Sequence, residues 1–293
     1  MKPSLFALMV FITTALMGTS FTIGKIGLSY ASPFLLAGLR FAIAGVLMAI
    51  FVVLFQRKHP RMMADWFRIV IIGFFQTTGV MGAIFFSLKT ITAGESAILT
   101  FINPLLVVIF SSLFLQMRYR WMQWGGVILG FLGVFITLGG QLSLQIGTII
   151  GFGGAVSFAI ATLLIKRWGV RFDTWVLTAY QMLFGGILLL LVSGLFEDAF
   201  FVVNATSLFI LLWLAVMASI VQFVTWFFLL KKGHPGKVSA FLFLAPFFGV
   251  ISGWLILNEP VGPSLLAGGA LIFAGIFAVN WPEKTDKSKF DAG

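Results

Sequence analysis

The chain has 293 residues, of which 60% are hydrophobic and only 10% are charged, and its mean hydropathy is +1.09. Soluble domains carry about 25% charged residues, so this composition excludes a protein whose surface faces mainly water. The chain contains no cysteine, which excludes disulfides and thiol chemistry, and 19 Lys and Arg against 9 Asp and Glu give a net charge of +10.

Ten apolar stretches follow one another along the chain. Each is close to the roughly 20 residues that a helix needs to cross a bilayer. Strand-like alternation is absent, and a helix satisfies its own backbone hydrogen bonds in lipid. The predicted fold class is therefore an all-α integral membrane protein with ten transmembrane helices. We expect these helices at residues 4–24, 33–55, 67–88, 96–115, 121–138, 147–165, 174–194, 206–230, 238–257 and 263–281.

The basic residues sort to one face of the predicted bundle. When the turns are assigned alternately to the two faces, every Lys and Arg except Lys25, Lys89 and Arg40 falls on the same face. A surplus of basic residues marks the cytoplasmic side of a membrane protein. We therefore expect a multi-pass protein of the cell membrane, with both termini and the tail 284–293 in the cytoplasm. The sorting makes the lipid bilayer, and not nucleic acid, the expected partner of these charges.

The second half of the chain repeats the first. A shift of 142 residues brings together positions of the same type, among them Pro104 and Pro246, Gly126 and Gly268, and Gly133 and Gly275. We predict two repeats of five helices each, residues 1–140 and 141–283. Because five is an odd number, the second repeat is inverted in the membrane. Inverted repeats are typical of secondary transporters, in which the two copies exchange shapes and open a central site to each side in turn.

Two glycine pairs have the spacing that lets helices approach closely. They are Gly126 with Gly130 and Gly147 with Gly151. Such pairs predict helix packing within the chain or a contact with a second copy of it, so a homodimer is one expected partner.

The repeated segments resemble a known family. The stretch SAILTFINPLLVVIFSSLFLQMRYRWMQWGGVILGFLGVF and its echo VSAFLFLAPFFGVISGWLILNEPVGPSLLAGGALIFAGIF are similar to the paired repeats of EamA-type transporters, within the drug/metabolite transporter superfamily. The resemblance covers nearly the whole chain. It departs from the pattern where Met117 of the first repeat stands in the place of Glu259, whose role is left open.

The resemblance implies a function and a site. It implies a bundle whose central cavity is lined mainly by the first, third, fourth, sixth, eighth and ninth helices, with the fifth and tenth at the edge. It also implies export of small organic metabolites, amino acids among them, through the cytoplasmic membrane.

Arg40 is the clearest candidate for the substrate pathway. It lies seven residues into the second predicted helix, and ionisable side chains inside membranes are costly and usually face a cavity. It is either a counter-charge for an anionic group such as a carboxylate, or a structural arginine bonded to carbonyl groups. Gln76, Gln222 and Trp226 join it because the third and eighth helices line the implied cavity. Their alternative role is hydrogen bonding and packing between helices.

The start of the fourth predicted helix collects residues that are awkward in a membrane. Glu95 either complements the dipole of the helix N-terminus or serves as a proton or amine site. Asn103 bonds a freed carbonyl or the substrate, and Pro104 kinks the helix, as Pro246 does in the second repeat. Lys237 is the repeat partner of Glu95 on the opposite face. We expect the stretch from Glu95 to Pro104 and its equivalent from Lys237 to Pro246 to act as gates on opposite sides of one cavity.

Several chemistries find no support in the sequence. There is no Walker loop and no HExxH motif, and His59 and His234 fall in predicted loops. We therefore expect no catalytic residue, no metal site and no cofactor. The alternatives to a transporter are an intramembrane enzyme and a membrane sensor or scaffold. No predicted helix holds a central Asp or Glu, so proton coupling, exchange and facilitation all stay open.

Overall fold

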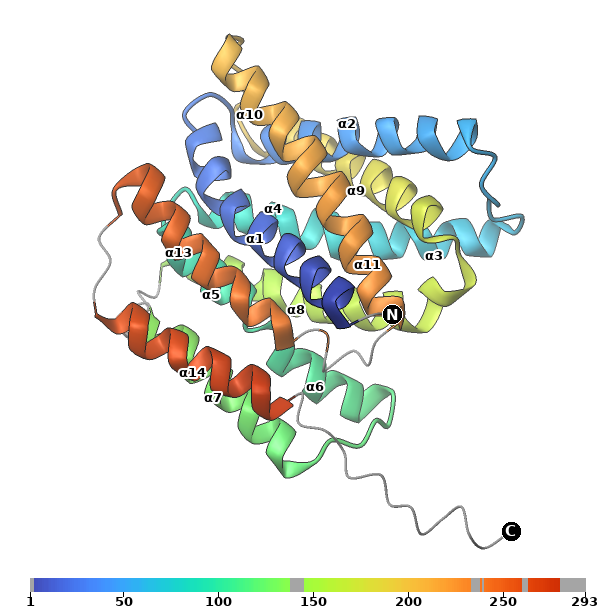
Figure 1. Cartoon of the computed structure of the whole chain (residues 1–293). Helices are drawn as coiled ribbons and strands as arrows, with labels where there is room; N and C mark the ends of the chain where they lie inside the picture. The colour runs from blue at the N-terminus through green and yellow to red at the C-terminus, as the bar shows by residue number, and fades with distance from the viewer. Residues whose placement is uncertain (1–2, 138–144, 233–237, 239, 260–262, 280–293) are drawn as a thin grey trace, which may run out of the picture.

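The computed structural model describes residues 3–137, 145–232, 238, 240–259 and 263–279, and within them the chain is almost entirely helical (Figure 1). The apolar stretches of the sequence form the helices, because a helix leaves no backbone group without a partner in lipid. The first repeat contains α1 (Pro3–Gly27), α2 (Pro33–Leu54), α3 (Met63–Gly73), η1 (Phe74–Gly79), α4 (Val80–Ser87), α5 (Ala93–Thr100), α6 (Asn103–Phe114) and α7 (Trp121–Thr137). The second contains α8 (Ile146–Trp168), the short η2 (Gly169–Arg171), α9 (Thr174–Phe196), α10 (Ala205–Ala215), η3 (Val216–Val221), α11 (Gln222–Lys232), η4 (Phe241–Phe243), α13 (Leu244–Leu257) and α14 (Ser264–Val279).

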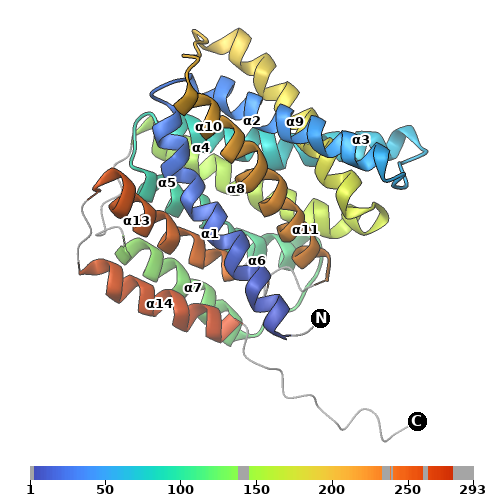
Figure 2. The same ribbon diagram turned by 45° about the horizontal axis from the view of Figure 1, so that its top comes forward.

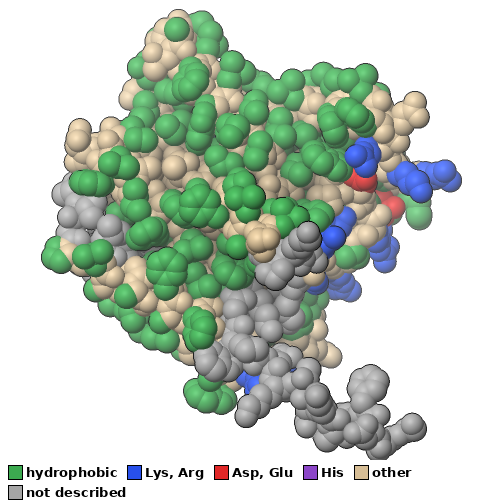
Figure 3. Space-filling view, in the orientation of Figure 1, with side chains coloured by type: hydrophobic (Ala, Val, Ile, Leu, Met, Phe, Trp, Pro, Cys, Tyr) green, Lys and Arg blue, Asp and Glu red, His purple; other side chains and the backbone are tan. Residues whose placement is uncertain are grey.

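These elements form ten spans in the described part of the chain, which confirms the predicted fold class. Six helical segments are long and apolar enough to cross a membrane, and the spans of α5 with α6, α7, α13 and α14 are shorter or broken. The exterior is apolar, with large side chains such as Phe209 and Leu195 that are 69% and 75% exposed. Figure 3 shows hydrophobic side chains over most of one face, with Lys and Arg gathered at the end where α2 meets α3.

The third and eighth spans share an interruption of the α-helical hydrogen-bond pattern that the sequence does not predict. The third changes to a π-helical pattern over Phe74–Gly79, and the eighth does so over Val216–Val221. These are the same positions after the 142-residue shift. A π-helical turn inserts one residue into the backbone ladder and is frequent at functional sites.

The fourth and ninth spans are broken just before their prolines. The first breaks at residues 101–102 and the second at η4, and each proline lies in the first turn of the helix that follows, α6 or α13. The sequence predicts a kink inside one helix, whereas the structure begins a new helix there. The first turn of a helix accepts proline because its N–H would have no intrahelical partner.

Packing between the halves follows the inverted repeat. α2 packs along α9, while the contact of α1 with α13 corresponds to that of α8 with α6 (Figures 1 and 2). A side chain at Gly45 would lie 2.5 Å from the backbone nitrogen of Leu183, and one at Gly186 would lie 2.5 Å from that of Ala42. A shift of 141 residues exchanges these two contacts. The α2–α9 pair is therefore the place where the two repeats cross.

α7 and α14 lie side by side at the edge of the bundle in both views, as the resemblance implies (Figures 1 and 2). The predicted glycine pair of α7 packs within the chain. A side chain at Gly126 would lie 2.8 Å from the carbonyl oxygen of Gly275, and one at Gly130 would lie 2.5 Å from the ring of Phe243. Gly147 and Gly151 likewise face the chain itself. Homodimer formation stays a prediction, and it cannot use these occupied glycine faces.

Candidate functional site

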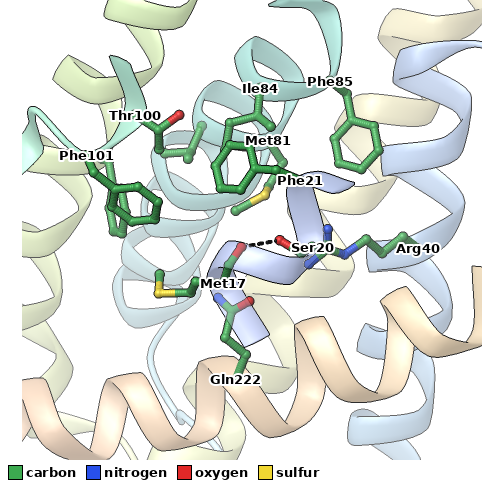
Figure 4. Close-up of a pocket in the computed structure, with 12 residues that line it drawn as sticks. Met17, Ser20, Phe21, Arg40, Met81, Ile84, Phe85, Thr100, Phe101 and Gln222 are labelled. Carbon is green, nitrogen blue, oxygen red and sulfur yellow. Dashed lines mark hydrogen bonds between the residues drawn. The ribbon is translucent and has the colours of Figure 1, made fainter. Parts of the chain in front are cut away.

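A small cavity lies between the two repeats, with Arg40 in its wall (Figure 4). Its volume is about 20 Å³, which is room for about one water molecule. Figure 4 shows Arg40 from α2 and Gln222 from α11 directed toward Met17 and Ser20 of α1. The lining residues are Met17, Ser20, Phe21, Arg40, Val80, Met81, Ile84, Phe85, Thr100, Phe101, Phe158 and Gln222.

The lining agrees in part with the one that the family resemblance implies. The first, third, fourth, sixth and eighth spans contribute to the cavity. The second span adds Arg40, and no described residue of the ninth span is among the lining. The cavity therefore lies in the space between the two repeats, which is called the chamber below.

Arg40 is fully buried and is fixed to the π-helical segment η3. Its Nε donates to Ser219 Oγ at 2.7 Å, and its Nη2 donates to the carbonyl oxygen of Ala218. The guanidinium carbon lies 4.7 Å from the ring centroid of Phe41 and 6.0 Å from that of Phe85. In the described part of the chain, no carboxylate forms an ion pair with Arg40. Arg40 thus bonds a carbonyl oxygen, as a structural arginine would, and its role as a counter-charge for a substrate stays a prediction.

Gln181 occupies the position equivalent to Arg40 in the second repeat. Its Oε1 accepts a hydrogen bond of 2.8 Å from Thr77 Oγ1, and Thr77 is the equivalent of Ser219. Each π-helical segment therefore receives one polar side chain from the facing helix of the other repeat. One of these side chains is a cation and the other is a neutral amide, so the two equivalent contacts differ in charge.

Six residues have buried side-chain polar atoms without a hydrogen-bond partner among the described residues, and Arg57 and Thr162 are two of them. Both side-chain polar atoms of Gln76 and of Asn103 are in this state, as are Trp226 Nε1 and Gln181 Nε2. Buried polar groups are nearly always bonded to protein or water, so such atoms require a partner that the protein itself does not supply. Gln76, Asn103 and Trp226 lie outside the lining of the closed cavity, although the Trp226 ring contacts Phe158, which lines it.

The predicted gate residues fall into two groups. Asn103 is the first residue of α6, and Pro104 and Pro246 lie in the first turns of α6 and α13. Glu95 lies in α5, but its side chain and the whole of Lys237 are outside the described part of the chain. The prediction that Glu95 and Lys237 mark gates on opposite sides of one cavity therefore stays a prediction.

The contact between α1 and α13 includes polar pairs that are not predicted from the sequence. α1 and α13 meet through Gly18, where a side chain would lie 2.3 Å from the carbonyl oxygen of Ala245. Further along the pair, Thr22 Oγ1 and Ser252 Oγ are 2.8 Å apart, and Lys25 Nζ lies 3.0 Å from Glu259 Oε1. Glu259 is therefore the partner of Lys25, and it does more than end a turn.

The equivalent contact between α8 and α6 has a different character. The positions that match Thr22 and Ser252 hold Leu163 and Phe110, which cluster with Val107 and Ala159, whereas Lys166 matches Lys25. Met117 takes the place of Glu259, so the carboxylate that binds Lys25 has no counterpart. The α1–α13 contact thus includes two polar pairs, and the positions equivalent to Thr22 and Ser252 in the α8–α6 contact are apolar.

Family models match both halves of the chain. The model described as the EamA-like transporter family matches residues 4–139 and again residues 145–281. The chain belongs to the EamA-like transporter family. It is a multi-pass membrane transporter, and the two matches correspond to the two repeats of the fold.

Relatives of this EamA-like transporter cover nearly its full length. It is 32% identical over 289 residues to an uncharacterized transporter, YvbV, of Bacillus subtilis. The aligned region covers 96% of this chain and 93% of YvbV. It is 28% identical over 282 residues to a WAT1-related chloroplast protein of Arabidopsis thaliana, covering 92% of this chain and 68% of that one. A solved crystal structure superposes with a TM-score of 0.77 at 22% identity, over 94% of this chain and 96% of that one, which shows a shared fold.

Proposed function

We propose that this EamA-like transporter is a secondary transporter that moves small organic metabolites with an anionic group across the cytoplasmic membrane. Amino acids and related carboxylates are the class that we propose, and export is the direction. One observation carries the proposal, which is that Arg40 is buried in the cavity wall and forms no ion pair with a carboxylate in the described part of the chain.

An unpaired cation is costly at this depth. Removing a charge from water costs several kcal/mol even after relaxation, and residues that stay charged inside membranes mark substrate or ion pathways. A carboxylate on the substrate would complete the charge balance that Ser219, Ala218 and Phe41 leave unfinished. The partnerless polar atoms of Gln76, Asn103 and Trp226 then serve as further hydrogen-bonding groups for the polar parts of the substrate.

Access requires the repeats to rearrange. A cavity of about 20 Å³ is too small for an amino acid, so substrate enters only when one end of the chamber opens. We place both termini in the cytoplasm, so that the α1–α13 contact with its Lys25–Glu259 pair closes the outer end. Pro104 and Pro246 begin the helices α6 and α13 that move, and Glu95 is the candidate for proton or amine binding at the outer mouth.

Reconstituted transport tests this proposal. The purified protein in proteoliposomes is screened for uptake or counterflow of amino acids, other organic acids and neutral or cationic analogues of similar size. Carboxylate-bearing solutes should be transported, and Arg40→Gln should abolish their flux, while Arg40→Lys retains part of it. Arg167→Gln, which changes an exposed arginine outside the chamber, is the matched control and should leave flux unchanged.

Two outcomes would contradict the proposal. One is unchanged flux in Arg40→Gln protein that is folded and inserted, as judged by its thermal unfolding in detergent. The other is a preference for cationic solutes over anionic ones, because a buried guanidinium repels them. A measured chemical conversion of the solute, in place of movement, would favour the intramembrane enzyme instead.

A further inference from the structure

A second, larger cavity lies at the basic end of the molecule, away from the chamber between the repeats. Its volume is about 890 Å³, and it opens between the α2–α3 turn and the α8–α9 turn. The first turn belongs to the first repeat and the second turn to the other. Figure 3 shows Lys and Arg side chains gathered at this end, where α2 meets α3.

The lining carries more positive than negative charge. Arg57, Lys58, Arg61 and Arg171 line the cavity, together with the two carboxylates Asp65 and Asp173. Both carboxylates are already engaged. Asp65 pairs with Arg68, which lies outside the lining.

Asp173 caps α9 by accepting a hydrogen bond of 2.8 Å from the backbone nitrogen of Trp175, and it lies 3.8 Å from Arg57 Nη1. Among the described residues, Lys58, Arg61 and Arg171 form no ion pair, and Arg57 Nε is buried without a partner. Several cations around one hollow repel one another, so the arrangement calls for an anion.

Exposed apolar side chains of the α2–α3 turn and the start of α3, called the rim below, lie among or next in sequence to the lining residues. Phe55 in the lining is 62% exposed, and Met62, Met63 and Phe67 on the following turns are 63%, 83% and 64% exposed. Trp66 is partly buried and contacts Tyr180 edge-on, at a ring-centroid distance of 4.7 Å. Aromatic residues of this kind mark the level of the membrane–water interface. The cavity thus has a charged lining, and exposed apolar side chains lie close to that lining in the sequence.

We propose that this cavity binds the phosphate group of an anionic phospholipid from the leaflet that faces the basic end. Lys and Arg beside a membrane attract anionic headgroups, and basic pockets between transmembrane helices bind them specifically. The guanidinium groups of Arg61 and Arg171 offer paired donors to the phosphate oxygens, and the exposed apolar rim holds the chains. A free phosphate would use the same donors but not the rim. A bound lipid bridges the two turns, and so links the two repeats independently of the substrate.

Lipid titration tests the site. The full chain in neutral detergent micelles is titrated with phosphatidylglycerol, with phosphatidylcholine and, separately, with inorganic phosphate, and binding is followed by tryptophan fluorescence. Phosphatidylglycerol should bind with saturation, whereas the other two should not. The variant K58Q/R61Q/R171Q should weaken this binding on the order of a hundredfold, since each basic residue near an anionic surface contributes a factor of about five.

A matched variant controls for diffuse charge. R118Q/R120Q/R167Q removes three exposed arginines predicted on the same face but outside the cavity, and it should keep the affinity of the unaltered protein. Equal losses in both variants would overturn the site in favour of general attraction to the basic face. Saturable binding of inorganic phosphate at the same affinity would overturn the assignment to a lipid. Both variants should unfold at the temperature of the unaltered protein, and if the cavity variant does not, the double variant R61Q/R171Q is titrated in its place.

Discussion

Arg40 and Gln181 are two versions of the same structural feature. Each reaches from the helix that crosses between the repeats to a hydroxyl group on a π-helical segment, Ser219 in one case and Thr77 in the other. A π-helical turn displaces backbone groups from the regular ladder, which gives such a side chain something to bind. The difference between the two is one charge, to which we attribute the proposed preference for anionic solutes.

The candidacy of Arg40 could be predicted from the sequence, because a lone charge in an apolar helix is conspicuous. Its partners could not be predicted, since Ser219 lies 179 positions away and nothing in its neighbourhood differs from an ordinary apolar helix. The pairing of Lys25 with Glu259, 234 positions apart, was hidden for the same reason. Residue types thus reveal which side chains need a partner, and only the packing of helices decides which partner they meet.

Ser219→Ala should remove one hydrogen bond of Arg40 without changing a residue that lines the cavity. The substitution removes the acceptor of the Nε bond, which leaves a buried donor unsatisfied, and we expect the free energy of unfolding to fall by about 1–3 kcal/mol. Thr225→Ala is the control on the same span, because its hydroxyl bonds only to the backbone of its own helix. That variant should lose about 0.5 kcal/mol. Denaturation in detergent measures both, and equal losses would mean that the Arg40–Ser219 bond adds nothing.

The spans themselves are the part of the fold that hydropathy describes well. Their number and order could be predicted from apolar runs, because a helix that satisfies its own backbone crosses the bilayer when about 20 of its residues in a row are mainly apolar. The π-helical segments and the breaks before Pro104 and Pro246 divide spans that hydropathy treats as uniform. They depend on contacts with neighbouring helices, so an average over a window of sequence cannot detect them.

Two adjacent glycines in α7 allow the effect of close helix packing on stability to be measured apart from the effect of glycine itself. A methyl group at Gly126 would lie 2.8 Å from the backbone of α14, whereas one at Gly125 would meet nothing within 4 Å. Gly126→Ala should therefore destabilise the protein by about 1–3 kcal/mol through overpacking. Gly125→Ala should be neutral or stabilising by about 0.5–1 kcal/mol, since alanine restricts the unfolded chain. Thermal unfolding in detergent compares them, and a similar effect at both sites would contradict the close α7–α14 contact.

At the scale of the whole molecule, the inverted repeat relates the two ends of the bundle to each other. The inverted repeat exchanges the α1–α13 contact with the α8–α6 contact, so the two ends are built from equivalent helices with different residues. The α1–α13 contact has the Thr22–Ser252 hydrogen bond and the Lys25–Glu259 pair, whereas Leu163 and Phe110 take the positions of Thr22 and Ser252 in the α8–α6 contact. We propose that these unequal contacts favour one resting state and that a bound substrate shifts the balance.

The orientation of the bundle is open to direct labelling, because the chain has no cysteine of its own. Cysteine at Phe196, which is 77% exposed at the end of α9, should react in intact cells with a maleimide that cannot cross the membrane. Cysteine at Arg61, exposed in the α2–α3 turn, should react only after permeabilisation. The basic turns would then face the cytoplasm. Labelling in the reverse order would refute that orientation.

Distances between spin labels at the two ends test alternating access most directly. One pair of labels is placed at Ser29 and Ile256, beside the α1–α13 contact, and the other at their repeat equivalents Val170 and Phe114, beside the α8–α6 contact. All four positions are exposed. Double electron–electron resonance in nanodiscs should show that a transported solute changes the two distances in opposite directions, and that Arg40→Gln suppresses this response. If both distances move together, or neither moves under conditions that support flux, then the two repeats do not exchange shapes around Arg40.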